Sequence, residues 1–168
     1  MNYPGSISSK LPQVPTSIFA IMSKMANDYG AINLSQGFPD FPISETLISL
    51  VNKYMLAGLN QYAPMPGVLS LRGAISEKVK FLYGTTYNTD TEITVTAGAT
   101  QALFTAIMAL IKEGDEVIIF TPAYDSYAPA VELAGGKPVF VQLESPGYRI
   151  NWDLVMKLIN GKTRMIII

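Results

Sequence analysis

The chain has 168 residues, of which 49% are apolar and 15% are charged. A folded chain of this length removes ~70% of its unfolded surface from water, so we expect one domain or a large piece of one. Histidine and cysteine are both absent from these residues. This excludes Ser-His-Asp and Cys-His nucleophile pairs, disulfides, and metal sites built on imidazole or thiolate, and we predict no metal site. An acid or base here has to be Lys, Asp, Glu or Tyr.

The charged residues are nearly balanced, with twelve Lys+Arg against thirteen Asp+Glu and a net charge of −1. The basic residues are scattered along the chain, so we expect no nucleic-acid partner. The most apolar run, residues 102–111, is shorter than the ~20 residues that a membrane-spanning helix needs, and we interpret it as a buried helix. No basic segment leads into an apolar one at the N-terminus, so we expect no secretory signal and a cytoplasmic location.

The first half of the chain is predicted to be an extended arm followed by helices. Residues 1–15 are rich in Pro and Ser and show no periodicity. Apolar residues then recur at helical spacing in three stretches, which end at Gly30, near Gly58 and at Gly84. The three predicted helices therefore begin near residues 18, 44 and 71. Two loops with prolines and aromatic residues, 32–42 and 61–67, separate them.

From Glu92 onward, short β-branched runs alternate with helical periods. This alternation predicts strands over 93–96, 116–120, 138–143 and 164–168, and helices over 100–112, 124–134 and 152–159. The strands are too apolar to have a face in water, which is typical of a parallel sheet with helices on both sides. The predicted fold class is α/β, with three α/β/α layers and a mostly parallel sheet.

The last four residues, Met165 to Ile168, form an apolar stretch without a turn residue, a charge or a helix after it. Natural chains usually finish at the surface of a domain. We therefore expect the chain to be truncated, with the missing portion beginning at the end of this strand.

The first candidate site is the predicted strand-turn-helix around Gly98. Where a helix begins, backbone N–H groups are unpaired and the helix dipole is positive, which favours an anion. The N–H groups of Gly98 to Thr100, together with the Thr100 hydroxyl, suit a phosphate group. The alternative is an ordinary tight turn in which Thr100 caps the helix.

The second candidate is Tyr124, in the turn that follows the next predicted strand. In an open parallel sheet, consecutive turns at the carboxyl ends of strands line one crevice. Tyr124 would then face a ligand on the Gly98 turn and could stack on a flat ring. The alternative is that Tyr124 and Tyr127 simply pack beneath the helix.

Two glycine- and aromatic-containing loops supply further candidates. Gly37 could donate a backbone N–H to a carboxylate, and Tyr62 could donate its hydroxyl to a phosphate. The alternatives are a connector fixed by prolines for the first loop and a packed aromatic residue for the second.

Five segments together resemble a known family. They are residues 33–41 (NLSQGFPDF), 60–67 (NQYAPMPG) with Leu71 and Arg72, 94–103 (TVTAGATQAL), 114–117 (GDEV) and 122–127 (PAYDSY). Each is weak alone, but in this order they resemble the N-terminal half of class I/II, fold-type I pyridoxal-phosphate aminotransferases. The most similar subgroup is the methionine and kynurenine aminotransferase-like enzymes.

The resemblance implies a cofactor site for pyridoxal 5'-phosphate. Gly98, Ala99 and Thr100 match the family's phosphate-binding turn, and Tyr124 matches the aromatic residue that stacks on the pyridine ring. Tyr62 matches the tyrosine that reaches the cofactor phosphate of the neighbouring subunit. A homodimer of the full-length protein is implied by this resemblance.

The resemblance also implies a substrate contact and a domain organisation. Gly37 matches the glycine whose backbone helps to hold the substrate carboxylate, and we assign Arg72 a structural role. Residues 1–43 correspond to an N-terminal arm and helix of the small domain. Residues 44–168 correspond to the N-terminal half of the large domain that binds the cofactor.

The family's Schiff-base lysine does not match any lysine in this sequence. None of the nine lysines lies in the expected Ser-x-x-Lys context: these are Lys10, Lys24, Lys53, Lys78, Lys80, Lys112, Lys137, Lys157 and Lys162. The pyridinium-binding Asp and the main substrate-binding arginine also come later in the family. We therefore assign no catalytic residue and expect this portion alone to be inactive.

The function that the resemblance implies is transfer of an amino group between an α-amino acid and a 2-oxo acid through pyridoxal 5'-phosphate. Two alternatives stay open from the residues. One is a carbon-sulfur β-lyase of the same fold, which would eliminate from a cysteine-type substrate. The other is a non-catalytic α/β module that binds a phosphorylated metabolite at the Gly98 turn.

Overall fold

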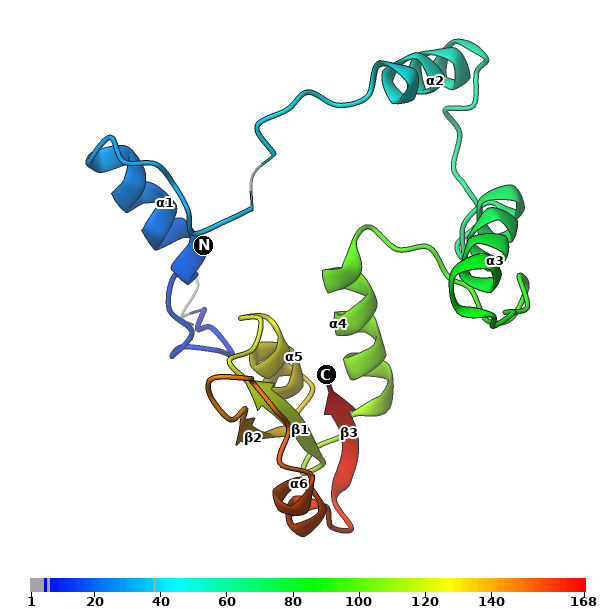
Figure 1. Ribbon diagram of the computed structural model, residues 1–168. Helices are drawn as coiled ribbons and strands as arrows, with labels where there is room; N and C mark the ends of the chain where they lie inside the picture. The colour runs from blue at the N-terminus through cyan, green and yellow to red at the C-terminus, as the bar shows by residue number, and fades with distance from the viewer. Residues whose placement is uncertain (1–4, 6, 38) are drawn as a thin grey trace. The chain divides into compact units, whose positions relative to one another are not determined.

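The computed structural model describes residues 5, 7–37 and 39–168, so part of the predicted arm and Phe38 of the first predicted loop lie outside it. Figure 1 shows the elements in chain order. They are α1 (Ile18–Asp28), α2 (Glu45–Leu56), α3 (Leu69–Tyr83), α4 (Ala99–Leu110), β1 (Glu116–Thr121), α5 (Tyr127–Leu133), β2 (Lys137–Gln142), α6 (Trp152–Leu158) and β3 (Thr163–Ile167).

The described chain divides into two compact units. The first combines the part of Met1–Ile21 that is described with Ala97–Ile168, and the second is formed from Met22–Thr96. The first unit therefore holds the Gly98 and Tyr124 turns, and the second holds Gly37 and Tyr62. The predicted boundary after residue 43 separates the small and large domains of the whole family fold. It stays a prediction.

A parallel sheet forms the centre of the first unit. Its strand order is β2-β1-β3, and β1 pairs in parallel with both neighbours. The four middle residues of β1, from Val117 to Phe120, are all buried. A central strand of a parallel sheet is covered on both faces, which explains why this run has no polar residue. The predicted α/β class with a parallel sheet is confirmed.

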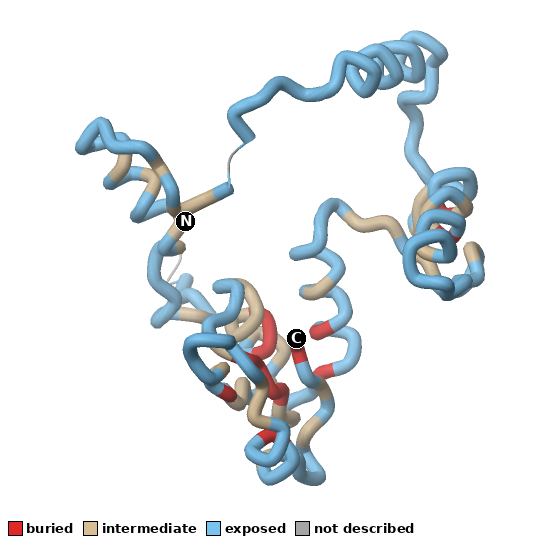
Figure 2. Tube along the Cα trace, viewed as in Figure 1, coloured by how far each residue is buried: buried red, intermediate tan, exposed pale blue. Residues whose placement is uncertain are grey.

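Helices cover both faces of this sheet because successive side chains of a strand point to opposite sides. On one face, Val117 and Ile119 pack with residues of α4, α5 and β3 in one apolar cluster. On the other face, Ile118 and Phe120 pack with Val155 of α6 and with β2. Figure 2 shows the buried residues concentrated on β1 and the elements that surround it. The arrangement has the three predicted α/β/α layers.

The predicted helices are present, and the largest difference in their boundaries is at the start of α5. The helix expected from Tyr124 begins only at Tyr127. Proline has no backbone N–H and is tolerated in the first turn of a helix, where that group would have no partner. A start at Tyr127 places Pro129 in the first turn, whereas a start at Tyr124 would place it in the second. The later start leaves Tyr124 in the connecting turn.

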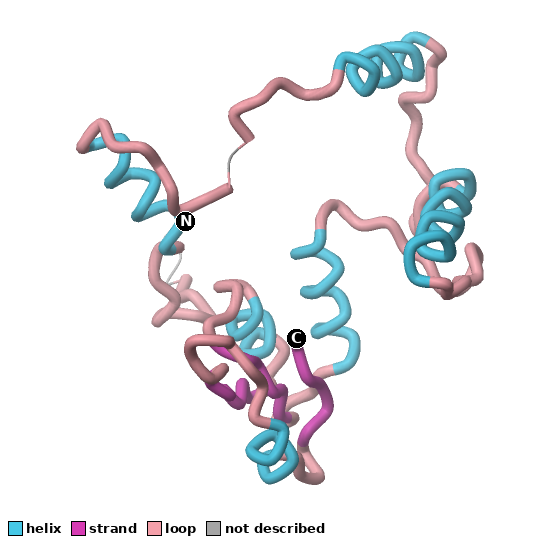
Figure 3. Tube along the Cα trace, viewed as in Figure 1, coloured by secondary structure: helices cyan, strands magenta, loops and turns pink. Residues whose placement is uncertain are grey.

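The strand predicted over residues 93–96 is wrong. Figure 3 shows this segment as part of the loop between α3 and α4. The β-branched residues Thr94, Val95 and Thr96 favour extended backbone, but a strand also needs a partner for its hydrogen-bond ladder. Val95 instead donates one backbone hydrogen bond to the Pro66 carbonyl, at 2.9 Å. The Val95 side chain also packs against Gly67, where a Cβ would be only 2.7 Å from a Val95 methyl carbon.

The second unit contains α2 and α3, and its described buried residues are both polar. They are Arg72 and Ser76, on α3. Arg72 donates to the carbonyls of Gly67 and Thr89, and its guanidinium lies 3.8 Å from Asp90. These contacts hold the loop before α3 and the loop after it against the helix. This agrees with the structural role predicted for Arg72.

No helix in the described part of the chain is both long enough and apolar enough to cross a membrane.

Candidate functional site

The Gly98 turn has a backbone conformation that suits glycine. Gly98 precedes the first residue of α4 and has φ +92°. Residues with a Cβ rarely adopt this conformation, which explains why a glycine stands here. A Cβ built at Gly98 would meet no atom of the described residues within 4 Å. The space in front of the backbone is therefore open to a ligand atom.

The start of α4 presents its first N–H groups at this turn. α4 begins at Ala99. The backbone N–H groups of Ala99 and Thr100 therefore have no carbonyl partner within the helix, because that partner would lie four residues earlier. Both residues are exposed. The partial positive charge of the helix N-terminus and these N–H groups favour an anion at the same point. The predicted phosphate-binding residues thus lie together on one exposed turn.

Gln101 is a residue of this turn that the sequence analysis did not assign to the site. Its side-chain Oε1 accepts a hydrogen bond from the backbone N–H of Ala97, at 2.6 Å. Gln101 is the third residue of α4, which is the position from which Glu or Gln reaches back in a capping box. The sequence lacked the full signal of a capping box, because the N-cap residue is Gly98 and not Ser or Thr. The bond holds Ala97, and with it the turn, against the start of the helix.

Thr100 and the turn after β1 line one small cavity between α4 and α5. Its volume is about 80 Å³, and Ser126 and Tyr127 contribute to its other wall. The packing of α4 on α5 therefore brings the predicted phosphate-binding turn and the aromatic turn to neighbouring positions. The two turns were expected to meet because each would follow a strand of one parallel sheet; residues 93–96 form no strand, so their proximity comes from the packing of α4 on α5.

The two tyrosines of the aromatic turn have different surroundings. Tyr127 is half-buried and packs against the apolar cluster of α4, α5 and β1, so the packing interpretation describes it well. Tyr124 is 48% exposed. Its ring lies 5.9 Å from that of Tyr127, with the planes at 61°. Tyr124 therefore keeps about half of its surface exposed, unlike Tyr127.

A cavity of about 380 Å³ lies beside Tyr124 at the carboxyl ends of the strands. Its walls include Phe120 of β1 and Ile167 of β3. A second aromatic ring, that of Tyr148, lines the same cavity. Mostly apolar walls with an aromatic residue at the edge suit a flat, partly apolar molecule.

Gly37 and Tyr62 belong to the second unit. Tyr62 is fully exposed, so the interpretation as a packed aromatic residue does not describe it. A Cβ at Gly37 would meet no atom of the described residues within 4 Å. The loop before Gly37 is held to α1, because Asn33 and Gln36 both donate side-chain hydrogen bonds to the Ser23 hydroxyl, at 3.1 Å each.

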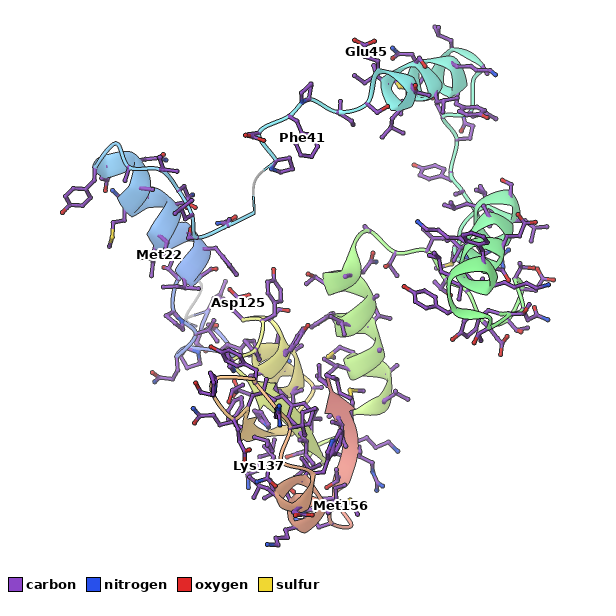
Figure 4. The ribbon with its side chains drawn as sticks, in the orientation of Figure 1. Met22, Phe41, Glu45, Asp125, Lys137 and Met156 are labelled. Carbon is purple, nitrogen blue, oxygen red and sulfur yellow. The ribbon has the colours of Figure 1, made fainter. Side chains whose placement is uncertain are left out.

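Ser17 and Asp125 form a contact that no sequence pattern indicated. The Ser17 hydroxyl donates to Asp125 Oδ2 at 2.8 Å, although 108 residues separate the two. Asp125 follows Tyr124 directly, and Figure 4 labels it in the turn before α5. The start of α1 is therefore bonded to the turn that carries the candidate ring-stacking residue.

The described residues contain no group of three or more acidic, His or Cys side chains placed to hold a metal ion. The polar groups around Gly98 are instead N–H and hydroxyl donors, which bind anions rather than cations.

The chain matches the aminotransferase class I and II family over residues 29–168. It is 49% identical to the methionine aminotransferase of Escherichia coli (strain K12) over 167 residues, which cover 99% of this chain and 43% of that protein. It is 38% identical to a probable N-succinyldiaminopimelate aminotransferase of Mycobacterium tuberculosis (strain CDC 1551 / Oshkosh), covering 95% of this chain and 41% of the relative.

A solved structure shows the same similarity in three dimensions. The crystal structure of YbdL from Escherichia coli, described as having a methionine aminotransferase function, superposes with a TM-score of 0.92 at 49% identity. The match covers 97% of this chain and 43% of that one. The chain thus spans about two-fifths of the length of these relatives. The resemblance predicted from the five sequence segments is confirmed at the level of the family.

Proposed function

The chain belongs to the aminotransferase class I and II family, and from this premise we propose that it forms the cofactor-holding N-terminal part of an enzyme that transfers an amino group between an α-amino acid and a 2-oxo acid. The family's cofactor is pyridoxal 5'-phosphate. The observation that carries the proposal is the open Gly98 turn, whose Thr100 shares a small cavity with Ser126 and Tyr127, next to the turn that carries Tyr124.

The residues of this turn fit the phosphate end of the cofactor. A Cβ at Gly98 would stand in open space, so a phosphate oxygen can approach the backbone where a side chain would otherwise be. Ala99 and Thr100 would donate their backbone N–H groups, and Thr100 would add its hydroxyl. A hydrogen bond to a charged group is worth ~1.5 to 3 kcal/mol.

Tyr124 fits the role of a face for the pyridine ring. Its ring is half-exposed and lines the cavity of about 380 Å³ at the carboxyl ends of the strands. Stacked or tilted aromatic pairs contribute ~0.5 to 1.5 kcal/mol beyond the burial of apolar surface. When bound, pyridoxal 5'-phosphate supplies an electron sink for chemistry at the substrate's α-carbon.

The proposal also includes two residues of the second unit, Gly37 and Tyr62. Gly37 would donate its backbone N–H to the substrate carboxylate, and Tyr62 would donate its hydroxyl to the cofactor phosphate of a second subunit. The open space at Gly37 and the full exposure of Tyr62 support these roles. The role of Tyr62 implies a homodimer, which we propose from the family resemblance. The expected cytoplasmic location stays a prediction.

The transfer reaction is tested in a chimera in which this chain replaces the matching 43% of the Escherichia coli methionine aminotransferase. We expect transfer of the methionine amino group to a 2-oxo acid. Thr100→Ala should lower cofactor affinity by about tenfold or more, since each 1.4 kcal/mol is a factor of ten. Thr105→Ala, also exposed on α4, is the matched control and should leave affinity unchanged.

Two outcomes would contradict the proposed transfer. A folded chimera that binds the cofactor but releases pyruvate from a cysteine-type substrate without a 2-oxo acid would favour the β-lyase. A folded chimera that binds phosphate but has no reaction would favour the non-catalytic module. Circular dichroism and thermal unfolding distinguish both from a chimera that does not fold.

The 168-residue chain by itself is predicted to be inactive. Treatment with pyridoxal 5'-phosphate and borohydride should fix no stoichiometric cofactor to a single lysine. Clean labelling of one lysine, located by peptide mapping, would overturn the interpretation that none of the nine is the Schiff-base residue.

A further inference from the structure

The turn that carries Tyr124 is held by the start of α1. The Ser17 hydroxyl donates to Asp125 Oδ2 at 2.8 Å and accepts from the Phe19 backbone N–H at 3.3 Å. A serine hydroxyl has one donor and two acceptor positions, so both bonds form at the same time. Ser17 therefore fixes the first turn of α1 and joins it to the residue after Tyr124.

The same segment contacts the Tyr124 side chain directly. The Phe19 ring lies 6.1 Å from the Tyr124 ring, with the planes tilted by 37°. Tyr127 lies 5.9 Å from it at 61°. These distances fall within the range of favourable aromatic pairs, ~4.5 to 7 Å. The Tyr124 ring thus lies near two other rings, while the residue stays 48% exposed.

Tyr124 lies on the connecting turn before α5 and not within the helix. Its backbone carbonyl accepts one turn hydrogen bond, from the Tyr127 N–H at 3.3 Å, so contacts of the side chain add to the order of the ring. Ordering a side chain on binding costs ~0.5 to 1.5 kcal/mol, and contacts made before binding remove that cost. The hydrogen bond from Ser17 to Asp125 and the contact of the Phe19 ring with Tyr124 join this turn and its ring to the start of α1.

We propose that Ser17, Phe19 and Asp125 are positioning residues that hold the Tyr124 ring in the orientation in which it stacks on a flat ligand. The hydrogen bond from Ser17 to Asp125 fixes the turn, and the Phe19 ring limits rotation of the Tyr124 side chain. The inference rests on the proposed function of Tyr124. It adds that the N-terminal segment, more than a hundred residues earlier in the chain, sets the orientation of that ring.

The first test measures the ring contact in the 168-residue chain without ligand. Nuclear Overhauser effects between the Phe19 and Tyr124 ring protons should be present in the natural sequence. These effects should weaken in Ser17→Ala and in Asp125→Ala, which remove the hydrogen bond. They should return in Ser17→Thr, which keeps a hydroxyl donor, and in Asp125→Asn, which keeps an oxygen acceptor. Ser49→Ala, which removes an exposed hydroxyl bonded to the Thr46 carbonyl, is the matched control. Unchanged effects in both alanine variants would overturn the inference.

The second test compares two probes, pyridoxamine 5'-phosphate and inorganic phosphate, with the same chain. Ser17→Ala and Phe19→Leu should weaken binding of pyridoxamine 5'-phosphate by roughly two- to tenfold, the value of one aromatic pair. They should leave the affinity for inorganic phosphate unchanged. Thr100→Ala should weaken both probes, because it acts on the phosphate. Phe81→Leu, an exposed residue of α3, is the control for Phe19→Leu.

The outcomes separate this inference from the proposed function. If the natural chain binds pyridoxamine 5'-phosphate and both variants bind it equally well, the positioning inference fails and the proposed function stands. If the natural chain binds neither probe, the proposed cofactor site fails, and the ring contact still decides whether Ser17 holds Tyr124. If the variants lose both probes together with thermal stability, the contact is structural and the positioning role is overturned.

Discussion

Strand β1 and helix α2 have similar apolar residues but opposite surroundings. Val117, Ile118 and Ile119 of β1 are at most 1% exposed, whereas α2 has no buried residue and its Ile48 is 45% exposed. Both segments have the secondary structure that their patterns predicted. The difference teaches that local pattern selects a helix or a strand, while burial depends on whether other elements cover the apolar face.

The two units also differ in what they bury. The first unit buries Ile and Val side chains in two apolar clusters on either face of β1. In the described part of the second unit, the buried residues are Arg72 and Ser76, and both bond to backbone carbonyls. Removal of apolar surface from water therefore stabilises the first unit. Hydrogen bonds from α3 to its neighbouring loops organise part of the second.

The largest loss of stability is expected for a substitution in β1, compared with a similar substitution in α2. Ile119→Ala should lower the free energy of unfolding of the first unit by ~2 to 5 kcal/mol, because a buried isoleucine leaves a cavity. Ile48→Ala on α2 should change the free energy of unfolding of the second unit, measured by hydrogen exchange of α2 amides, by less than ~0.5 kcal/mol, since Ile48 is half-exposed and alanine favours helix. Urea unfolding followed by the fluorescence of Trp152, which contacts Phe120 of β1, measures the first unit. Equal effects of the two substitutions would contradict the comparison.

The second prediction concerns the polar interior of the second unit. Arg72→Ala should destabilise it by ~1 to 3 kcal/mol, because the carbonyls of Gly67 and Thr89 lose a charged donor. Lys24→Ala is the control in the same unit: its exposed ammonium lies 2.5 Å from Asp28, which is also exposed, and exposed ion pairs contribute less than ~1 kcal/mol. Hydrogen exchange of α3 amides reports on this unit. Protection of α3 that survives Arg72→Ala would show that its loops are held by other contacts.

The third prediction tests whether the Gly98 turn needs its backbone conformation. Gly98→Ala should destabilise the first unit by ~1 to 2 kcal/mol, the cost of a Cβ at positive φ, because no described atom obstructs the side chain. It should also weaken binding of inorganic phosphate. Gly161→Ala has similar open space and no φ in the left-handed region, so it should be close to neutral. Thermal unfolding and phosphate titration of the two variants check both expectations.

The smallest expected effect separates stability from anion binding at the same turn. Gln101→Ala should cost ~0.5 to 1 kcal/mol, because the Ala97 N–H loses its partner. Gln101→Glu keeps an acceptor and adds a negative charge near a helix N-terminus, which stabilises by ~0.3 to 1 kcal/mol. The same charge should weaken phosphate binding by repulsion. Tighter phosphate binding by Gln101→Glu would place the anion elsewhere.

Most of the fold followed from the sequence because its signals are local. Helical periodicity and terminal glycines predicted α1, α2 and α3, and Gly84 ends α3 with φ +72° as expected for such a residue. The continuous apolar run of β1 predicted a strand covered on both faces. The strand predicted over 93–96 was wrong because β-branched composition favours extended backbone but supplies no pairing partner.

The candidate site was predicted only in part. Glycine before a helix start indicated the Gly98 turn, and its geometry supports an anion there. The capping role of Gln101 did not follow from the sequence, because the N-cap residue is Gly98 and not the Ser or Thr of a capping box. Tyr124 and Tyr127 have the same residue type and lie in the same turn, so the sequence left both interpretations open for each. The packing of α5 on α4 and β1 distinguishes them, because it half-buries Tyr127 and leaves Tyr124 about half-exposed.

The sequence by itself determined the helices, the central strand, the α/β class and the family, since periodicity, capping residues and short motifs all act within a few residues. Only the tertiary structure decided that α5 leaves Tyr124 on a turn, that residues 93–96 do not form a strand, and that Ser17 bonds to Asp125. Contacts between residues 108 positions apart exist only after the intervening chain has folded. For that reason no local pattern contains them.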